Sequence, residues 1–434
     1  PPAVCPVCGA SRDAFRLVSG GAPRAATRPR RAPAGRRILI VGGGIAGHTA
    51  AHVARELDPD CRITLATDEP HRFYNRLNLT RYLAGEIGRE ALFDFGDDWY
   101  TAQAIEVVTE ARAIDLDPVA RRVVFANGLE LAYDALILAH GSRAAVPRFC
   151  REGVAGLFLL RTLEDVEGIL AACRPGSRAA VVGGGVLGLE AACGLAARGA
   201  EVALFECAPH LMPRQLDPEG AALLAQLVRE RGVVPHVGVT VEALLGETRV
   251  AGLALADGRW FEAELIVVST GIVPNVDWVK RAGLACRRGL VVDDRMRTSA
   301  DAVYAAGDVA EWRGRVVGLW RHAVEQARVA AASAVGRPAE FDGAVPVTVL
   351  KWPGLPVASI GEILPDGGGV TSQVTRDPAQ RAYRRVVFRA GLPVGALLVN
   401  TAEGLAELTR LVAAAAQVDR LAPAVGPGGA AVGG

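Results

Sequence analysis

The chain has 434 residues, a formal net charge of +1 and a hydrophobic fraction of 50%. This length exceeds one ordinary core and predicts two or three globular domains. The near-neutral charge gives no reason to expect nucleic acid or an anionic membrane as a partner. No apolar run reaches the roughly 18 residues of a membrane span, no signal peptide is visible, and the eight cysteines do not suggest a disulfide framework. We therefore expect a cytoplasmic protein.

The first residues, PPAVCPVCGASRDAF, contain a C-x-x-C motif formed by Cys5 and Cys8. Two thiolates are half of a tetrahedral metal site, because a four-coordinate metal needs four ligands. Residues 1–19 are too few to form a core, and residues 20–36 consist mainly of Gly, Pro, Ala and Arg, which is typical of a solvated linker. The other six cysteines lie in or beside apolar runs, and we expect small buried side chains there: Cys61, Cys150, Cys173, Cys193, Cys207 and Cys286.

Two stretches repeat the same predicted order of strand, glycine turn, helix and strand. RRILIVGGGIAGHTAAHVARELDPDCRITLAT begins at residue 36, and SRAAVVGGGVLGLEAACGLAARGAEVALFECAP begins at residue 177. Each is followed by apolar strands around a turn, Asn127-Gly128 in the first case and Asp257-Gly258 in the second. This repetition predicts an α/β fold with two dinucleotide-binding, Rossmann-like domains, the second inserted into the first.

The domain boundaries are predicted from the same patterns. The first dinucleotide-binding domain takes residues 37–150 and 270–336, and the second takes residues 151–269. Strand-like runs such as VPVTVLKWPGLPVASIGE and the amphipathic AEGLAELTRLVAAAAQ predict a small α+β domain at residues 337–420. The tail, residues 421–434, has little to bury and is expected to be disordered.

The first glycine turn has the G-x-G-x-x-G spacing, with Gly42, Gly44 and Gly47. The first glycine permits a tight turn, the second lets the backbone approach a pyrophosphate, and the third lets the helix pack close to the strand. The helix N-terminus then faces the phosphates with its positive end. Asp68 and Glu69 follow the second strand, where a carboxylate is expected to hold the adenosine ribose.

The second glycine turn repeats this spacing with Gly183, Gly185 and Gly188. Its carboxylate is Glu206, at the end of the strand EVALFE. A carboxylate at this place accepts a hydrogen bond from a ribose 2′-hydroxyl and repels a 2′-phosphate. The sequence therefore favours NADH over NADPH at the second site.

Residues 37–335 resemble the FAD-dependent pyridine-nucleotide reductases that have two dinucleotide domains. Within these, they are most similar to the flavin part of the NADH nitrite reductase large subunit and to the rubredoxin and ferredoxin reductases. The resemblance spans some 300 residues in the order of that family. It is carried by VGGGIAG, FYNRLNLTRYLAGE, LILAHGS, LRTLEDVEGI, VVGGGVLGLEAA, STGIVPN and VYAAGDVAEW.

The resemblance implies a role for each matching residue. The first glycine turn, with Asp68 and Glu69, holds the ADP half of FAD, and Asp308 accepts hydrogen bonds from the ribityl chain. Trp320 corresponds to an aromatic residue beside the flavin, although an ordinary core tryptophan explains it nearly as well. The remaining implied positions are Asn75 and Arg76 at the phosphates and ring, Gly271 near the nicotinamide, and Gly141 and Gly307 within the matched motifs.

Three departures from the family pattern affect the chemistry. Arg81 stands where the family often has Lys, and it is expected to pair with Glu190 near the flavin as a catalytic ion pair. His140 replaces the usual Thr of Ala-Thr-Gly, which we interpret as a tolerated replacement. The segment HRFYNRLNLTRYLAG, which faces the flavin in disulfide reductases of this family, contains no cysteine. Electrons must therefore pass to an acceptor outside the flavin site.

The N-terminal motif resembles the second half of a rubredoxin-like domain, whose first C-x-x-C lies some 12–15 residues earlier. The simplest interpretation is that this sequence is truncated, and that Cys5 and Cys8 bind iron or zinc only when the missing half is present. We expect an NADH-dependent FAD reductase that passes electrons to a rubredoxin-like or other acceptor. The alternatives are the flavin component of a nitrite-reductase-like system, an NADH oxidase, and a non-catalytic redox-sensing protein. A homodimer is left open.

Overall fold

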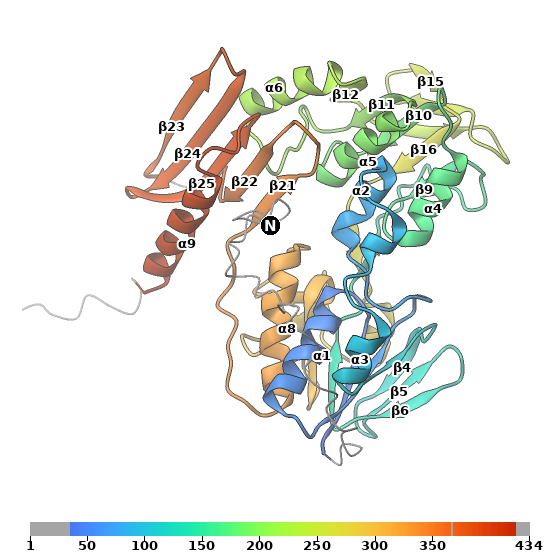
Figure 1. The fold of residues 1–434 in the computed structure, drawn as a ribbon, viewed down its shortest axis with the longest axis vertical. Coiled ribbons are helices and arrows are strands. Elements are labelled where there is room, and N and C mark those ends of the chain that lie inside the picture. The colour runs from blue at the N-terminus through green and yellow to red at the C-terminus, as the bar shows by residue number, and fades with distance from the viewer. Residues whose placement is uncertain (1–34, 366–367, 422–434) are drawn as a thin grey trace, which may run out of the picture.

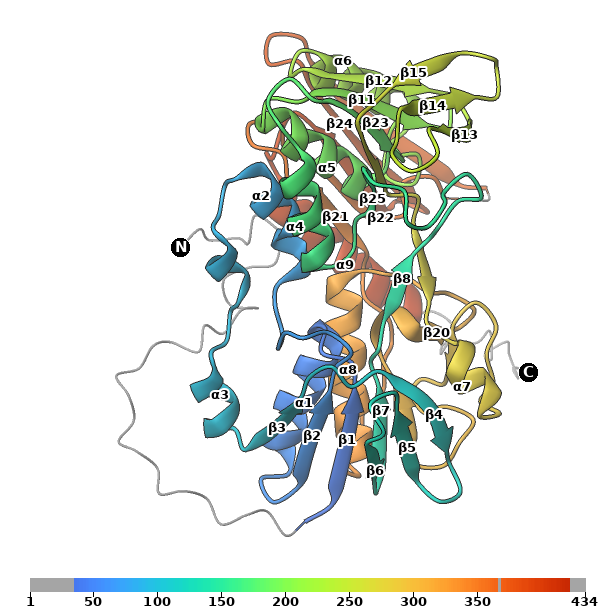
Figure 2. The same cartoon turned by 90° about the vertical axis from the view of Figure 1, so that its right-hand side faces the viewer.

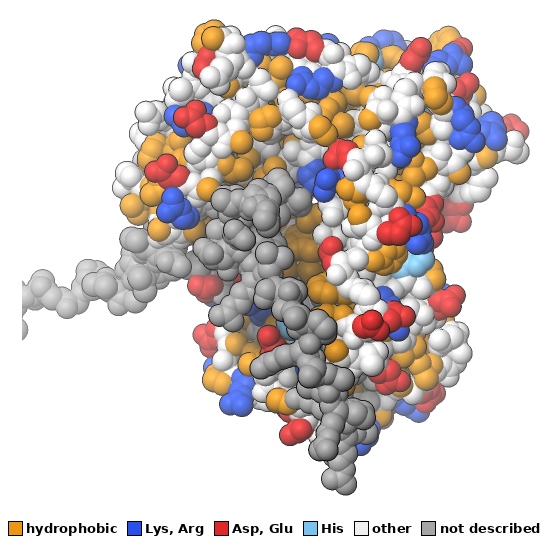
Figure 3. Space-filling view, in the orientation of Figure 1, with side chains coloured by type: hydrophobic (Ala, Val, Ile, Leu, Met, Phe, Trp, Pro, Cys, Tyr) orange, Lys and Arg blue, Asp and Glu red, His pale blue; other side chains and the backbone are white. Residues whose placement is uncertain are grey.

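The computed structural model describes residues 35–365 and 368–421. The expected half-knuckle at residues 1–19, the linker up to residue 34 and the tail after residue 421 lie outside the described residues and stay predictions. Within the described part of the chain, no helix is long and apolar enough to cross a membrane. Charged side chains of both signs are interspersed over the face in Figure 3, in keeping with the near-neutral net charge.

The first dinucleotide-binding domain is built on a five-stranded parallel sheet in the order β19-β7-β1-β2-β3, and Figure 2 shows β7, β1, β2 and β3 of this sheet. Its central strand is buried along four of its five residues, as the apolar run ILIV predicts. Because β19 comes from near residue 303 and pairs with β7 from near residue 136, the chain leaves this sheet and later returns to it. The predicted insertion of one domain into the other is therefore confirmed. The strands are β1 (Arg37–Val41), β2 (Arg62–Ala66), β3 (Ile105–Val108), β7 (Ala135–Leu138) and β19 (Val303–Ala305).

Helices α1 (Ile45–Leu57) and α8 (Trp320–Ala334) lie side by side against this sheet (Figure 1). Both are rich in alanine, and fully buried alanines such as Ala50 and Ala327 allow the two helix backbones to approach closely. The remaining elements of this domain are η2 (Arg76–Asn78), η3 (Arg89–Leu92), α3 (Asp97–Ala102), β4 (Ala113–Asp117), β5 (Arg122–Phe125), β6 (Glu130–Ala132), β8 (Ser142–Ala144), β17 (Ile272–Pro274), α7 (Asp277–Arg281), β18 (Leu290–Val292), η4 (Gly307–Val309) and β20 (Ala310–Trp312).

The second dinucleotide-binding domain repeats this plan with the parallel sheet β12-β11-β10-β16-β9. Each domain also carries a three-stranded antiparallel sheet, whose predicted turns contain Gly128 and Gly258 at φ +84° and +85°. Only glycine adopts such angles without strain, so both turns follow from the sequence. The elements are β9 (Leu157–Leu159), α4 (Leu163–Ala172), β10 (Arg178–Val182), α5 (Val186–Ala197), β11 (Glu201–Glu206), α6 (Pro218–Arg229), β12 (Val233–Val237), β13 (Val241–Leu245), β14 (Gly252–Leu255), β15 (Trp260–Glu262) and β16 (Leu265–Val268).

The C-terminal domain is an antiparallel sheet in the order β21-β22-β25-β24-β23 with one helix against it. Alternate residues of its central strands pack against this helix, which buries Val412 and Ala415. The predicted α+β class is therefore confirmed for this domain. Its elements are β21 (Val347–Leu350), β22 (Val357–Gly361), β23 (Val370–Asp377), β24 (Ala382–Arg389), β25 (Leu392–Val399) and α9 (Leu405–Leu421).

The hydrophobic cores do not follow the chain order of the domains. Helix α2 (Leu79–Ala84) comes between β2 and β3 of the first domain, yet Figure 2 shows it beside α5 of the second. Leu79 and Leu83 share one core cluster with the second domain and with Leu350 and Trp352 of the C-terminal domain. Among the described residues, one large apolar core therefore lies in the first domain, and another unites α2, the second domain and one face of the C-terminal sheet. Two smaller clusters lie in the second domain and between the C-terminal sheet and its helix.

Candidate functional site

The first glycine turn has the geometry of a phosphate-binding loop. Gly42 has φ +118°, and a Cβ there would lie 2.2 Å from the carbonyl oxygen of Ala139. A Cβ on Gly44 would meet nothing within 4 Å, so this glycine leaves open space for a ligand. Helix α1 begins directly after Gly44, and no side chain caps its first N–H groups. These N–H groups and the open face of Gly44 fit a pyrophosphate.

The second glycine turn has nearly the same geometry. Gly183 has φ +115° and approaches the carbonyl oxygen of Ser269, while a Cβ on Gly185 would again meet no atom within 4 Å. A Cβ on Gly188 would lie 1.8 Å from the carbonyl oxygen of Gly183, as one on Gly47 would from that of Gly42. Both turns therefore bring their helix close to their strand and leave room at the middle glycine, as the sequence predicts.

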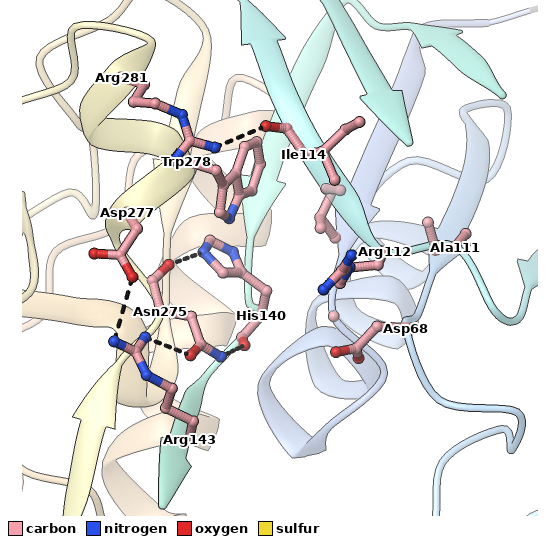
Figure 4. A pocket seen from close by; sticks show the side chains of 14 residues that line it. Asp68, Ala111, Arg112, Ile114, His140, Arg143, Asn275, Asp277, Trp278 and Arg281 are labelled. Atoms are coloured by element: carbon pink, nitrogen blue, oxygen red, sulfur yellow. Dashed lines mark hydrogen bonds and ion pairs between the residues drawn. The ribbon is translucent and has the colours of Figure 1, made fainter. Parts of the chain in front are cut away.

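A cavity of about 440 Å³ opens beside the first glycine turn (Figure 4). Asp68 and Arg112 lie on one wall, and His140 and Trp278 lie on the opposite wall. Gly42 also lines this cavity. Burial, followed by the charge of neighbouring Glu69, raises the pKa of Asp68. The position of Asp68 at this cavity fits the predicted contact with an adenosine ribose.

Glu69 has a different place from the one that the sequence suggests. Its carboxylate accepts hydrogen bonds from Tyr74 Oη (2.6 Å) and from Arg76, so Glu69 anchors this loop instead of lining the larger cavity. Together with Arg72 and Gly44 these residues line a small recess at the glycine turn. The guanidinium groups of Arg72 and Arg76 in this recess suit phosphate groups, and the predicted contact of Arg76 with FAD stays a prediction.

Asn75 has a local structural role that the sequence comparison did not predict. Its side chain accepts a hydrogen bond from Leu77 N (3.2 Å) and donates one to Asp94 (3.2 Å), so it caps η2. Its predicted contact with the FAD phosphates stays a prediction.

Asp308 lies at the seam between the two dinucleotide-binding domains. Its Oδ2 atom accepts hydrogen bonds from Ser142 Oγ (2.8 Å) and from Arg161 Nη2 (2.7 Å). Arg161 belongs to the second domain, just before α4, and its carbonyl oxygen accepts a hydrogen bond from Arg76 Nη1 (3.0 Å). The sequence prediction missed Ser142 and Arg161, although Arg161 lies in the matched motif LRTLEDVEGI.

His140 and Asn275 join the two chain segments that cross between the domains. His140 Nε2 lies 2.8 Å from the carbonyl oxygen of Asn275, and Asn275 Nδ2 donates to the carbonyl oxygen of His140 at 3.0 Å. The backbone N–H of Asn275 also donates to the carbonyl of Gly141 (3.1 Å). Burial lowers the pKa of His140 to about 4 despite this hydrogen bond, so the ring is neutral near pH 7. His140 therefore links the two chain segments that connect the domains, a role that we did not predict.

The residues expected near the flavin ring include one tryptophan and two glycines. Trp320 is the first residue of α8 and its ring centroid lies 6.1 Å from that of Phe73. Gly271 has φ +109° directly before β17, and the backbone N–H of Gly307 is held by Gln326 Oε1 (2.9 Å). Their predicted contacts with a flavin stay predictions.

The predicted ion pair between Arg81 and Glu190 is wrong. Arg81 Nε donates to Glu86 Oε2 (3.0 Å), and about a third of its side chain is exposed. Glu190 is buried, and its partner is Lys351 of the C-terminal domain, whose Nζ lies 2.7 Å from Oε2. Thr80 Oγ1 (2.8 Å) and the backbone N–H of Lys351 (2.9 Å) also donate to this carboxylate. The cation at Glu190 therefore comes from another domain, which the sequence prediction missed.

Glu206 has the predicted place at the end of β11. Its Oε2 accepts from the backbone N–H of Gly184 (2.7 Å) and its Oε1 from that of Ala208 (2.7 Å). These two bonds fix the carboxylate beside the second glycine turn, where a ribose is expected. Cys207 Sγ lies 3.4 Å from the same carboxylate.

The predicted metal ligands Cys5 and Cys8 lie outside the described residues. Among the described residues, no group of three or more His, Cys, Asp and Glu side chains is arranged to hold a metal ion. The six cysteines expected to be buried are all free thiols, but only Cys61, Cys173 and Cys193 are buried. Cys150 and Cys286 are partly buried and Cys207 is exposed, so the prediction of burial is wrong for these three.

Two glycine turns of this geometry, each followed by a carboxylate where a ribose is expected, are typical of a pyridine nucleotide-dependent flavoprotein. The model of the pyridine nucleotide-disulphide oxidoreductase family matches residues 36–331, and the chain belongs to this family. Residues 346–415 match the model of the rubredoxin NAD+ reductase C-terminal domain. The family uses FAD and NAD(H), in agreement with the cofactors predicted from the sequence.

Relatives of known function cover most of this chain. A nitrite reductase [NAD(P)H] of Bacillus subtilis is 34% identical over 85% of the chain, and the chain spans only 46% of that protein. The ferredoxin reductase component of a chlorobenzene dioxygenase of a Cupriavidus species is 30% identical, with 88% of this chain and 93% of that protein covered. The crystal structure of NADH:rubredoxin oxidoreductase from Clostridium acetobutylicum superimposes with a TM-score of 0.71 at 26% identity, over 87% and 94% of the two chains.

Proposed function

We propose that this protein is an NADH-dependent FAD reductase that passes electrons to a small iron–sulfur or rubredoxin-like acceptor. The observation that carries the proposal is the seam between the domains. Arg161 bonds to Asp308 there, Thr80 of α2 bonds to Glu190 of the second domain, and the segment that supplies Thr80, residues 71–85, contains no cysteine. A dithiol relay beside the flavin is therefore not available, and the electrons need an acceptor outside this site.

Bound FAD supplies the chemistry of this proposal, because a flavin accepts a hydride from NADH and donates single electrons to an iron centre. The chain supplies placement and charge. Gly44 and Arg76 hold the phosphates, Asp68 holds the adenosine ribose, and Glu206 holds the ribose of NADH. Lys351 and Glu190 keep one buried positive and one buried negative charge beside the reacting ring.

Lys351 is an unusual choice of cation for this chain. It is one of two lysines among 48 basic residues, so arginine is the ordinary cation here. A lysine ammonium is compact and can release its proton when buried, whereas an arginine guanidinium stays protonated. We propose that the Lys351 ammonium, held by Glu190 at 2.7 Å, lies near the flavin in the catalytic place that the sequence assigned to Arg81.

Stopped-flow measurements test this function directly. Anaerobic NADH should bleach the flavin within the time of a catalytic cycle, and oxidised rubredoxin or ferredoxin should then restore its absorbance rapidly. NADPH should be at least about tenfold less effective, because it lacks the 2′-hydroxyl and brings a phosphate to Glu206. Slow flavin reduction, or a long-lived reduced flavin that no iron protein reoxidises, would contradict the proposal and favour a redox-sensing protein.

The similarity to the nitrite reductase of Bacillus subtilis favours a second candidate, in which this chain is the flavin part of a nitrite-reducing system. The chain spans less than half of that relative, so the nitrite-reducing step would lie in another segment or subunit. Reoxidation of the reduced flavin by a sirohaem protein, and not by rubredoxin or ferredoxin, would support this candidate. Rapid reoxidation by oxygen alone would instead indicate an NADH oxidase.

We also propose that the protein works in the cytoplasm, since its six described cysteines are unpaired, as is usual in a reducing compartment. Homodimer formation stays a prediction that sedimentation analysis would test.

A further inference from the structure

The loop between Glu206 and α6 connects the second glycine turn to the C-terminal domain. It runs from Cys207 to Leu216, directly after the carboxylate that is expected to hold the ribose of NADH. Leu211, Met212 and Leu216 are completely buried, so this loop is packed on the domain. Its two ends are held by different partners.

The first end of the loop is bonded to the glycine turn. The backbone N–H of Met212 donates to the carbonyl of Gly184 (2.9 Å), and Gly184 N donates to Glu206 Oε2 (2.7 Å). A Cβ on Gly184 would lie 2.9 Å from a methyl group of Leu211 and 2.8 Å from Glu206 Cβ. A displacement of the loop would therefore move both the glycine turn and the carboxylate.

The second end of the loop is bonded to the C-terminal domain. Asp217 caps α6 by accepting from Gly220 N (2.9 Å), and the same carboxylate accepts from Tyr383 Oη (2.7 Å) and Arg385 Nη1 (3.0 Å) of β24. Asp217 is only 4% exposed. Burial alone would raise the pKa of Asp217, but the hydrogen bonds from Tyr383, Gly220 and Arg385 outweigh it and lower the pKa. The carboxylate is therefore charged near neutral pH and firmly held.

The middle of the loop is stiff enough to connect these two ends. Met212 has φ +49°, a left-handed conformation that is strained for a non-glycine residue and persists only where the surroundings impose it. The N–H groups of Gln215 and Leu216 both donate to the carbonyl of Met212 at 2.9 Å. Only four residues therefore separate Met212, which contacts Gly184, from the anchor at Asp217, and a tight turn spans most of them.

We infer that Tyr383 and Arg385 of the C-terminal domain are positioning residues for NADH, acting through Asp217 and the loop 207–216 on Glu206 and the second glycine turn. This inference rests on the proposed function, because it takes NADH as the ligand of that turn. It assigns to the C-terminal domain a second task beside the contribution of Lys351.

The same two elements offer a matched control. Arg381 lies on the residue before β24 and forms a double hydrogen bond, at 2.8 Å, with Glu230 at the far end of α6. Both side chains are about half exposed. Arg381→Gln therefore weakens the attachment of the same strand to the same helix. It leaves the loop 207–216 anchored at Asp217.

The experiment uses the FAD-loaded protein and three variants, Tyr383→Phe, Asp217→Asn and Arg381→Gln. Asparagine caps a helix about as well as aspartate, so Asp217→Asn removes the charge without removing the cap. The dissociation constant for NADH is measured by titration, and amide hydrogen exchange of residues 207–217 is followed by mass spectrometry. We expect Tyr383→Phe and Asp217→Asn to weaken NADH binding about tenfold, the size of one lost hydrogen bond to a charged group.

In the same two variants the amide hydrogens of residues 207–217 should exchange faster than in the wild type. The absorption spectrum of their bound flavin should stay normal. Arg381→Gln should leave both the dissociation constant and the exchange as in the wild type. If Tyr383→Phe and Asp217→Asn had the wild-type dissociation constant and amide exchange, this inference would be overturned, but the proposed function would not. Equal changes in all three variants would have the same consequence. A wild-type protein that does not bind NADH would overturn the proposed function together with the ligand named here.

Discussion

Replacing Lys351 with methionine should leave a buried carboxylate without its counter-ion. The side chains of Lys351 and Glu190 are 12% and 1% exposed, and Nζ lies 2.7 Å from Oε2. Methionine keeps most of the aliphatic length of lysine but has no charge. After the change, Thr80 Oγ1 and the backbone N–H of residue 351 still donate to Glu190. The loss is therefore mainly the cation, not the packing.

The size of the stability loss in Lys351→Met follows from the burial of the ion pair. Removing one partner of a buried ion pair typically costs about 3–5 kcal/mol, because the remaining charge is not solvated. The two hydrogen bonds that remain place the expected loss near the lower limit, at about 3 kcal/mol. Arg81→Ala is the matched control, since the pair between Arg81 and Glu86 is 35% and 26% exposed. Pairs of this kind contribute less than about 1 kcal/mol.

Hydrogen exchange in native conditions is the suitable assay, because unfolding of a three-domain chain is not a two-state process. The amides of α5 and β21 should lose about 3 kcal/mol of protection in Lys351→Met and little in Arg81→Ala. The double variant Lys351→Met/Glu190→Gln should regain most of that protection, because a neutral amide needs no counter-ion. Protection that stays within about 1 kcal/mol of wild type in Lys351→Met, or a double variant no better than the single one, would refute this reasoning.

Three further changes have defined outcomes. Glu206→Ala should raise the dissociation constant for NADH and bring it close to that for NADPH, and a wild-type preference for NADPH would contradict the assignment. Gly44→Val should abolish FAD binding without unfolding the chain, since its side chain would enter the open space at the phosphates, as flavin absorbance and circular dichroism would show. Burial lowers the pKa of His48 to about 3, so the folded protein resists protonation of this ring. The free energy of unfolding should therefore fall by up to about 5 kcal/mol between pH 6.5 and pH 3. In urea unfolding, His48→Phe should show a smaller dependence on pH in that window.

The glycine turns and the hairpin turns could be predicted because their causes are local. The spacing of Gly42, Gly44 and Gly47 after an apolar strand requires one backbone geometry, and Gly128 and Gly258 supply the positive φ that their turns need. Such features depend on residues that are adjacent in the sequence. The structure therefore agrees with the prediction at these positions to the level of single residues.

The partner of Glu190 could not be predicted from local pattern, because Lys351 is 161 residues away. The prediction of Arg81 failed for a local reason as well. Helix α2 ends at Gly85 in the left-handed conformation, and Glu86 then lies within reach of the guanidinium. An exposed carboxylate five residues away is an easier partner for a long side chain than a buried one. Which of Asp68 and Glu69 lines the larger cavity likewise depends on Tyr74, whose hydroxyl donates a hydrogen bond to Glu69.

The distribution of contacts indicates where this molecule can change shape. The C-terminal domain is joined to the second dinucleotide-binding domain by a shared apolar core and by the anchor at Asp217. Separating those two parts would expose buried hydrophobic surface, at a cost of about 25 cal/mol for each Å². The contacts across the seam to the first domain include polar pairs such as Arg161 with Asp308, which are part-buried and can exchange with water or ligand at lower cost. Any movement that admits NADH should therefore occur at the seam. Lys351, Glu190 and the loop 207–216 should then move as one unit relative to the flavin-binding domain.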